Sequence, residues 1–315
     1  MKPDVLVIQP TWDNQMQDLA QRYALHRYDL ADAAGKAAML AGEARHCQAI
    51  ITNGHAPLTA EMIADMPALQ VVACGSAGYD TIDVAALTAR GIALTTTSDA
   101  LADDVADLAV LLMLAARRDL IRAHHHVASG DWARRGSFAL QSSVRGKRLG
   151  IVGMGTIGQA IVPRARAMEL DIAYFSRKAR AGVDLPFQSD LLALAVWADI
   201  LIVIVPGGVA TQNLIDDAIL RALGPQGTLI NVSRGSVVDE PALIAALQDG
   251  GLGQAGLDVF WTEPTPDPAL TALPNVTLYP HHASGTVESR AAMAQRVVDT
   301  LDAHFAGLPL PSRVT

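Results

Sequence analysis

Residues 149–158 read Leu-Gly-Ile-Val-Gly-Met-Gly-Thr-Ile-Gly, an apolar run that ends in three closely spaced glycines. The run predicts a buried strand, and residues 159–168 predict a helix after it. In such a turn Gly153 permits a sharp bend, Gly155 lets a pyrophosphate approach the backbone, and Gly158 lets helix and strand pack closely. Since a helix N-terminus presents free N–H groups to an anion, we expect a dinucleotide to bind at this turn. The expected contacts are Gly153, Met154, Gly155, Thr156, Ile157 and Gly158.

Short β-branched runs alternate with longer amphipathic stretches along the whole chain. This order predicts an α/β fold in which helices cover parallel sheets. We expect buried strands at residues 5–8, 49–51, 71–73, 149–152, 172–175, 200–205 and 228–232. One long helix is expected over residues 101–126, because apolar residues recur there at helical spacing and acidic residues lie near its start.

The length of 315 residues favours two domains. We place a substrate domain at residues 1–98, completed by residues 286–315, whose helix at 287–305 would pack back on it. A dinucleotide-binding domain would occupy residues 99–285. The fold class predicted is therefore two Rossmann-like, doubly wound parallel-sheet domains with an active-site cleft between them.

The composition excludes several kinds of partner. Lys and Arg total 24 against 32 Asp and Glu, and a net charge of −8 disfavours binding to nucleic acid or anionic lipid. No apolar stretch approaches the roughly 20 residues that span a bilayer. Cys47 and Cys74 match no metal-ligand spacing and favour a reducing compartment. We therefore expect a cytoplasmic protein that binds no membrane, no nucleic acid and no metal.

The segment after the expected strand at 172–175 predicts which dinucleotide binds. An NAD site usually has an Asp or Glu here for the ribose 2′-hydroxyl. This chain instead has Ser176, Arg177 and Lys178, with Arg180 shortly after. Hydroxyl and cationic groups suit a 2′-phosphate, so NADP(H) is the predicted cofactor and NAD(H) the weaker one. The alternative is that these cations form a solvated loop.

Three later segments carry side chains suited to the reduction of a 2-oxo acid. Arg234 follows an expected strand, and its planar cation can orient a carboxylate and stabilise developing negative charge. His281 can donate a proton near neutral pH. Glu263 would favour the imidazolium form of His281 and fix its orientation.

The glycine turn and these segments occur together with three further motifs, at residues 75–80 (Gly-Ser-Ala-Gly-Tyr-Asp), 104–108 (Asp-Val-Ala-Asp-Leu) and 205–208 (Val-Pro-Gly-Gly). With these motifs in this order, the chain resembles the D-isomer-specific 2-hydroxyacid dehydrogenases. The resemblance spans most of the chain and implies that Arg234, Glu263 and His281 are catalytic. It also implies cofactor contacts from Ser176, Arg177, Lys178, Val232, Ser233, Arg234 and Asp258, whose counterpart binds the nicotinamide amide. The substrate contacts implied are Ser76, Ala77, Gly78, Arg234 and His281, and the backbone N–H groups of the loop 76–78 would hold a carboxylate.

One departure from the family pattern concerns the proton donor. The family usually has an aliphatic residue after the catalytic histidine, whereas this chain has His282. Either histidine could be the donor, and we favour His281 because it directly follows Pro280 as in the pattern.

Within the family, the chain is most similar to NADPH-dependent glyoxylate, hydroxypyruvate and hydroxyphenylpyruvate reductases. This similarity implies reduction of a small 2-oxo acid to the D-2-hydroxy acid. It also implies a homodimer, in which Trp132 is a candidate to reach the active site of the partner. The alternatives are a nucleotide-sensing, corepressor-like binding protein and an NAD-dependent dehydrogenase of another D-2-hydroxy acid.

Overall fold

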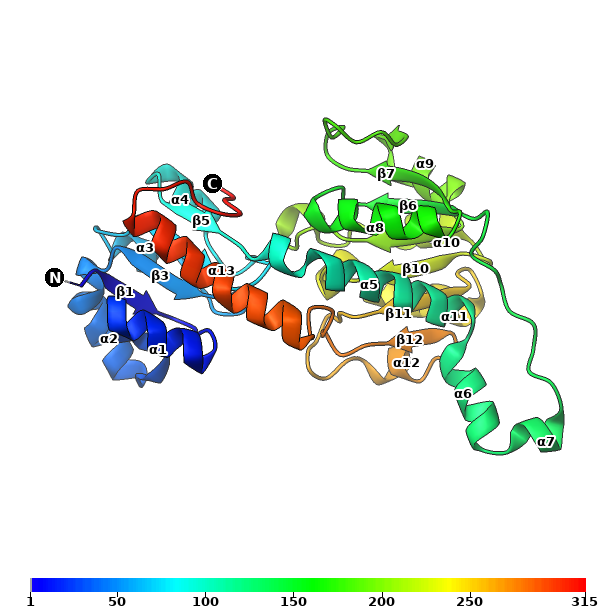
Figure 1. Ribbon diagram of the computed structural model, residues 1–315. Coiled ribbons are helices and arrows are strands. Elements are labelled where there is room, and N and C mark those ends of the chain that lie inside the picture. The colour runs from blue at the N-terminus through cyan, green and yellow to red at the C-terminus, as the bar shows by residue number, and fades with distance from the viewer. Residues whose placement is uncertain (1) are drawn as a thin grey trace. The chain divides into compact units, whose positions relative to one another are not determined.

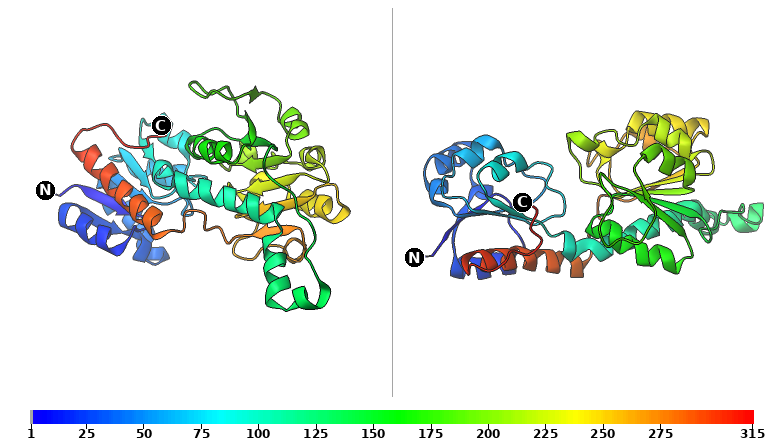
Figure 2. Two further views of the ribbon diagram at one scale, coloured as in Figure 1. Left: turned by 45° about the vertical axis from the view of Figure 1, so that its right-hand side comes forward. Right: turned by 90° about the horizontal axis from the view of Figure 1, so that it is seen from above.

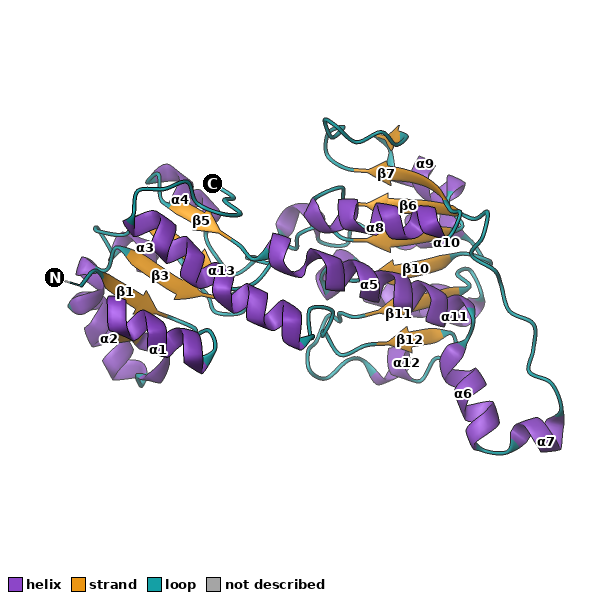
Figure 3. Ribbon diagram, in the orientation of Figure 1, coloured by secondary structure: helices purple, strands orange, loops and turns teal. Residues whose placement is uncertain are grey.

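The computed structural model describes residues 2–315. The chain divides into two compact units, one of residues 1–101 with 285–315 and one of residues 102–284. Helices and strands alternate along both units (Figure 1, Figure 3). The α/β class predicted from the sequence is confirmed, and each unit has its own parallel sheet.

Within the described residues, the sheet of the first unit has five parallel strands in the order β2-β1-β3-β4-β5. Alternate residues of the central strands face opposite sides: Leu6 and Ile50 belong to one apolar cluster, while Val5 and Ile51 belong to the other. Both faces are therefore buried, as is usual in parallel sheets. The strands are β1 (Asp4–Val7), β2 (Ala24–Arg27), β3 (Ala49–Thr52), β4 (Val71–Cys74) and β5 (Ala93–Thr95).

Helices cover both faces of this sheet (Figure 2). The final helix, α13 (Val287–Phe305), has the predicted bounds, and the Thr286 hydroxyl accepts the N–H of Ser289 at its start. Val297, Val298 and Leu301 of α13 pack into the cluster that contains Val5. The other helices are α1 (Asp13–Arg22), α2 (Ala33–Ala41), α3 (Ala60–Ala64) and α4 (Val84–Ala89).

In the described part of the second unit, seven parallel strands have the order β12-β11-β10-β9-β6-β7-β8. The order reverses between β6 and β9, which is where ligands bind in doubly wound sheets. The strands are β6 (Arg148–Val152), β7 (Asp171–Phe175), β8 (Phe187–Gln188), β9 (Ile200–Val203), β10 (Thr228–Asn231), β11 (Gln254–Leu257) and β12 (Val276–Leu278).

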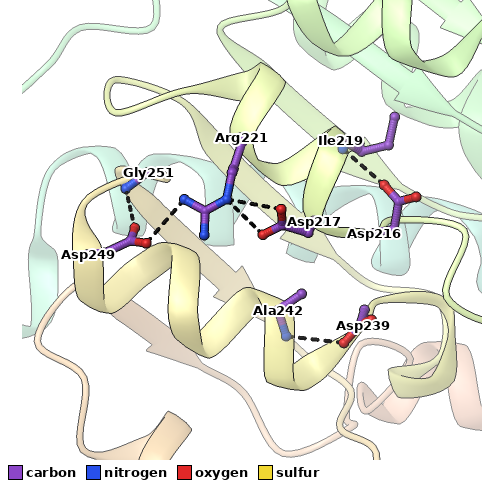
Figure 4. Close-up of polar contacts among 8 residues, drawn as sticks. All are labelled: Asp216, Asp217, Ile219, Arg221, Asp239, Ala242, Asp249 and Gly251. Carbon is purple, nitrogen blue, oxygen red and sulfur yellow. Dashed lines mark hydrogen bonds and ion pairs between the residues drawn. The ribbon is translucent and has the colours of Figure 1, made fainter.

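Several helices of the second unit begin at aspartate side chains that cap their first N–H groups. The Asp216 carboxylate accepts the N–H of Ile219 at the start of α10 (Asp217–Leu223). The Asp239 carboxylate accepts that of Ala242 in α11 (Glu240–Asp249) (Figure 4). Arg221 pairs with Asp217 and Asp249, which ties α10 to the end of α11 (Figure 4). The helices are α6 (Leu120–Ala128), α7 (Asp131–Arg135), α8 (Thr156–Ala167), α9 (Leu191–Trp197), α10 (Asp217–Leu223), α11 (Glu240–Asp249) and α12 (Pro268–Thr271).

The single long helix predicted over residues 101–126 is wrong. The structure has two helices there, α5 (Ser98–Arg117) and α6, separated by Asp119 in the left-handed conformation at φ 48°. The buried Arg117 side chain donates to the Thr228 hydroxyl at 3.1 Å, which fixes the end of α5 against β10. The apolar pattern continues through Leu120 and Ile121, so periodicity alone did not reveal the break.

The strand predictions located the central strands but not the edges. The expected strands at 200–205 and 228–232 end earlier, at Val203 and Asn231. The strands β2, β5, β8, β11 and β12 were missed. β2, β8 and β12 are only partly buried, while the buried strands β5 (Ala-Leu-Thr) and β11 (Gln-Ala-Gly-Leu) lack a β-branched run. None of the helices between residues 2 and 315 has the length and apolar character needed to cross a bilayer.

Replacing Thr228 by Val should lower the free energy of unfolding by about 1–3 kcal/mol, because a buried guanidinium loses its hydroxyl acceptor. The backbone should tolerate the change, since Val favours strands. Urea unfolding followed by circular dichroism measures the effect. The same substitution in an Arg117→Met background should cost much less, because no buried charge then needs the acceptor. Equal costs in the two backgrounds would contradict this account of the α5 end.

Candidate active site

The glycine turn joins β6 to α8 and has little room for side chains at two of its positions. Gly153 has φ 108°, and a Cβ there would lie 2.2 Å from the Ile204 carbonyl oxygen. A Cβ on Gly158 would lie 2.2 Å from the Gly153 carbonyl oxygen. Gly155 instead has nothing within 4 Å of its Cβ position and directly precedes the first residue of α8. The turn therefore leaves open backbone in front of a helix N-terminus, which suits a phosphate group.

The cationic segment after β7 lies beside this turn. The Gly153 N–H donates to the Phe175 carbonyl at 2.9 Å, so the cationic segment begins at Ser176, one residue beyond that contact. The Ser176 hydroxyl donates to the Lys178 carbonyl at 2.6 Å, and Arg177 and Lys178 are exposed. The structure thus brings the predicted 2′-phosphate residues next to the predicted pyrophosphate residues.

Arg234 lies just past the carboxyl end of β10 in a tightly bonded turn. The Asn231 side chain accepts the N–H and the hydroxyl of Ser233, at 3.0 and 2.7 Å, and donates to the Arg234 carbonyl at 3.0 Å. The Arg234 guanidinium donates to the Ser233 carbonyl at 2.7 Å and is half-buried. Val232 and Ser233 are buried. Asn231, which sequence reasoning missed, is what shapes the turn.

His281 and Glu263 form a close pair in the second unit. The Nδ1 atom of His281 lies 2.6 Å from Oε2 of Glu263, and the other carboxylate oxygen accepts the Phe260 N–H at 3.0 Å. Burial opposes ionisation of Glu263, but the hydrogen bonds from His281 and Phe260 and the charges of His281 and Arg234 outweigh it and lower its pKa. The arrangement keeps a carboxylate on the Nδ1 atom of the His281 imidazole.

Asp258 fixes the turn that carries His281. Its carboxylate is 1% exposed and accepts the N–H groups of His282 at 2.8 Å and Ala283 at 3.2 Å, while its carbonyl accepts that of His281 at 2.7 Å. His281 has φ 47°, a strained value that persists only where surrounding contacts impose it. Burial raises the pKa of Asp258, although both N–H donors act to lower it. The side chain of His282 is exposed.

The segments that carry Arg234 and Glu263 touch through their backbones. A Cβ on Gly235 would lie 2.0 Å from the carbonyl carbon and oxygen of Phe260 and 2.5 Å from the Trp261 nitrogen. The buried Glu240 carboxylate accepts the Trp261 N–H at 3.2 Å, and the indole donates to the Val238 carbonyl at 2.7 Å. Glu240 and Trp261 were also missed, because no sequence signal marks the backbone groups that they bind.

The loop 76–78 lies in the first unit, at the carboxyl end of β4. The Ser76 hydroxyl accepts the Gly54 N–H at 2.8 Å and donates to the Gly78 carbonyl at 2.5 Å. A Cβ on Gly54 would lie 2.1 Å from that carbonyl oxygen. Among the hydrogen bonds of residues 2–315, none uses the backbone N–H of Ala77 or Gly78 as donor. These two groups suit the carboxylate that the loop is predicted to bind.

The second unit has a glycine turn at the switch point of its parallel sheet, and it has a His–Glu pair and an arginine beyond the ends of nearby strands. This combination is typical of dinucleotide-dependent oxidoreductases. The family model for the D-isomer specific 2-hydroxyacid dehydrogenase, NAD binding domain, matches residues 110–283. This chain belongs to the D-isomer-specific 2-hydroxyacid dehydrogenase family, so the resemblance seen in the sequence is confirmed.

Individual relatives cover nearly the whole chain. A hydroxyphenylpyruvate reductase of Plectranthus scutellarioides is 42% identical over 306 residues, which are 97% of each chain. A 2-ketogluconate reductase of Gluconobacter oxydans is 40% identical over 304 residues, 96% of each chain. The crystal structure of an NADPH-dependent glyoxylate/hydroxypyruvate reductase of Sinorhizobium meliloti, in complex with NADP and malonate, has a TM-score of 0.87 at 38% identity. It covers 100% of this chain and 97% of that one.

Replacing Gly235 by Ala should lower the free energy of unfolding by about 1–3 kcal/mol, because the new methyl group forces the Phe260 backbone away. In a unit of this size, each kcal/mol corresponds to a melting temperature lower by roughly 2–4 °C. Differential scanning calorimetry measures the shift. The matched control is Ser236→Ala at the next, exposed position, which should melt as the unmodified protein does. A Gly235→Ala variant with unchanged melting would show that the two segments tolerate separation.

Proposed function

We propose that this protein reduces a small 2-oxo acid, such as glyoxylate or hydroxypyruvate, to the D-2-hydroxy acid with NADPH. The observation that carries the proposal is the 2.6 Å contact between His281 and Glu263, with the charge of Arg234 close enough to lower the pKa of Glu263. Reductases of glyoxylate, hydroxypyruvate and hydroxyphenylpyruvate among its relatives support the same reaction.

The residues of this group divide the work of the reaction between them. The Arg234 guanidinium binds the substrate and stabilises negative charge on the carbonyl oxygen. His281 donates the proton from Nε2 to that oxygen, while Glu263 accepts the Nδ1–H and keeps the ring in the orientation and tautomer that donation needs. The reduced nicotinamide, when bound, supplies the hydride to the carbonyl carbon. In the oxidative direction, His281 accepts the proton. The N–H groups of Ala77 and Gly78 hold the carboxylate of the substrate.

The residues present fit NADP(H). The open backbone at Gly155 in front of α8 accommodates a pyrophosphate, with Met154, Thr156 and Ile157 beside it. Arg177 and Lys178 supply the positive charge for a 2′-phosphate, and no carboxylate occupies residues 176–180. Val232, Ser233 and Asp258 lie at the ends of β10 and β11 and would meet the nicotinamide end. NAD(H) would bind more weakly, since its ribose offers these cations no phosphate.

The remaining assignments belong to the same proposal. Residues 1–98 with 286–315 would act as the substrate domain and residues 99–285 as the dinucleotide domain. The small number and the spacing of the cysteines, Cys47 and Cys74, favour a cytoplasmic location. A homodimer is proposed on the family resemblance, and Trp132, which is 62% exposed on α7, is the side chain offered to a partner.

Loss of NADPH absorbance on addition of glyoxylate or hydroxypyruvate tests the reaction. His281→Gln should lower kcat by about 10²- to 10⁴-fold, the usual contribution of a general acid. His282→Gln is the matched control and should retain most of the activity, since His282 contacts Asp258 through its backbone N–H and not through its side chain. An inactive His282 variant beside an active His281 variant would move the proton donor to His282. No consumption of NADPH by the unmodified protein with any 2-oxo acid would reject the proposed function.

The cofactor preference should invert when Ser176→Asp is combined with Arg177→Gln. The new carboxylate repels a 2′-phosphate and accepts a ribose hydroxyl, and a charge-assisted contact is lost. We expect the ratio of kcat/KM for NADPH over NADH to fall by about 10- to 100-fold. Arg145→Gln, at an exposed cation of the same unit, should leave the ratio unchanged. A clear preference of the unmodified protein for NADH would overturn the assignment.

A further inference from the structure

The sheet of the first unit has a ligand-binding position of its own. Its strand order reverses between β1 and β3, and doubly wound sheets bind ligands beyond the carboxyl ends of the strands at that point. A cavity of about 220 Å³ lies there. The segment after β1, the ends of β3 and β4 and the first half of α13 line it. The cavity thus occupies the place where this topology predicts a ligand.

The lining of the cavity favours a ligand that accepts hydrogen bonds. Arg290 of α13 is half-buried in the wall, and no described lining residue is acidic. The oxygen of the Asn53 side chain already accepts the N–H groups of His55 and Ala56, at 2.9 and 3.2 Å, so its amide nitrogen remains as donor. A guanidinium and an amide donor together suit carboxylate or hydroxyl oxygens. The lining also provides apolar surface, which suits the carbon atoms of such a ligand: Ile51, Met293, Ala294 and Val297.

The cavity adjoins the loop that is proposed to hold the substrate carboxylate. Gly75 lines the cavity and directly precedes Ser76, and its N–H donates to the carbonyl of Thr52, another lining residue, at 2.7 Å. Consecutive Cα atoms are about 3.8 Å apart, so the Cα atom of Ala77, two residues further on, lies no more than about 7 Å from that of Gly75. A 2-oxo acid held by its carboxylate at this loop is therefore within reach of the cavity with a chain of a few carbon atoms.

We propose that this cavity receives the substituent on the carbonyl carbon of the 2-oxo acid, and that Arg290 selects substituents that end in oxygen acceptors. The inference rests on the proposed function and extends it to the substrate class. Since a water molecule occupies about 30 Å³ of liquid, the cavity has room for several heavy atoms. Terminal carboxylates and hydroxyl groups share the required chemistry.

Matched substrates separate this selection from chain length. 2-Oxoglutarate ends in a carboxylate, and 5-methyl-2-oxohexanoate replaces that carboxylate by an isopropyl group of similar shape. 2-Ketogluconate tests hydroxyl groups, and glyoxylate carries no substituent. The measurement is kcat/KM with NADPH for each acid, in the unmodified protein and in Arg290→Met, Arg290→Lys and Arg45→Met. Arg45 is an exposed cation of the same unit outside the lining, which makes it the control.

We expect the unmodified protein to prefer at least one oxygen-ended acid over 5-methyl-2-oxohexanoate. That preference should fall by about tenfold in Arg290→Met. It should be partly retained in Arg290→Lys and unchanged in Arg45→Met. The acid that loses most identifies the substituent as a carboxylate or a hydroxylated chain. Circular dichroism and melting temperature show whether the variants fold as the unmodified protein does. If Arg290→Met does not fold, the comparison is made with Arg290→Lys.

Two results would overturn the inference. The first is that the unmodified protein reduces glyoxylate but favours the isopropyl acid, and the second is that Arg290→Met has the same preference as the unmodified protein. Either result would exclude the role of Arg290 and leave the proposed reaction intact. If no 2-oxo acid is reduced, glyoxylate included, the proposed function fails and this inference fails with it.

Discussion

The buried carboxylate of Asp258 is the contact on which the geometry of the second unit's site depends. It accepts two consecutive N–H groups beyond His281 and so imposes a turn in which His281 has φ 47°. That turn brings the imidazole to Glu263, whose own loop is held by Phe260 and by the close approach of Gly235. A single buried acid after β11 therefore positions a side chain that lies 23 residues later in the sequence.

The parallel sheets explain why the polar side chains gather where they do. In each unit the strand order reverses once, and the loops on either side of the reversal diverge to leave a crevice. In the second unit this crevice holds the glycine turn. In the first it holds the cavity lined by Arg290 and Asn53. Glycines at Gly54, Gly153 and Gly235 allow backbones to approach more closely than any side chain would permit.

Local sequence predicted most of the central strands, the glycine turn and the last helix, because each is encoded by apolar periodicity or by residues a few positions apart. It did not predict the break at Asp119, since the apolar pattern runs through it and the end of α5 depends on a contact between Arg117 and Thr228. The edge strands β2, β8 and β12 were missed because partly buried segments lack the continuous apolar run of a central strand. In the site, Asn231, Glu240 and Trp261 were missed because their importance lies in backbone groups that they bind.

The sequence by itself determined the α/β class, the position of the glycine turn and the absence of a carboxylate after β7. The class follows from the order of apolar segments along the chain, and the other two follow from residue type and spacing within one segment. Only the tertiary structure decided that His281 rather than His282 contacts Glu263, that Asp258 anchors their turn and that Arg290 lines a cavity with Asn53. These relations join residues far apart in the chain. They depend on strand order and on close packing, which no local pattern records.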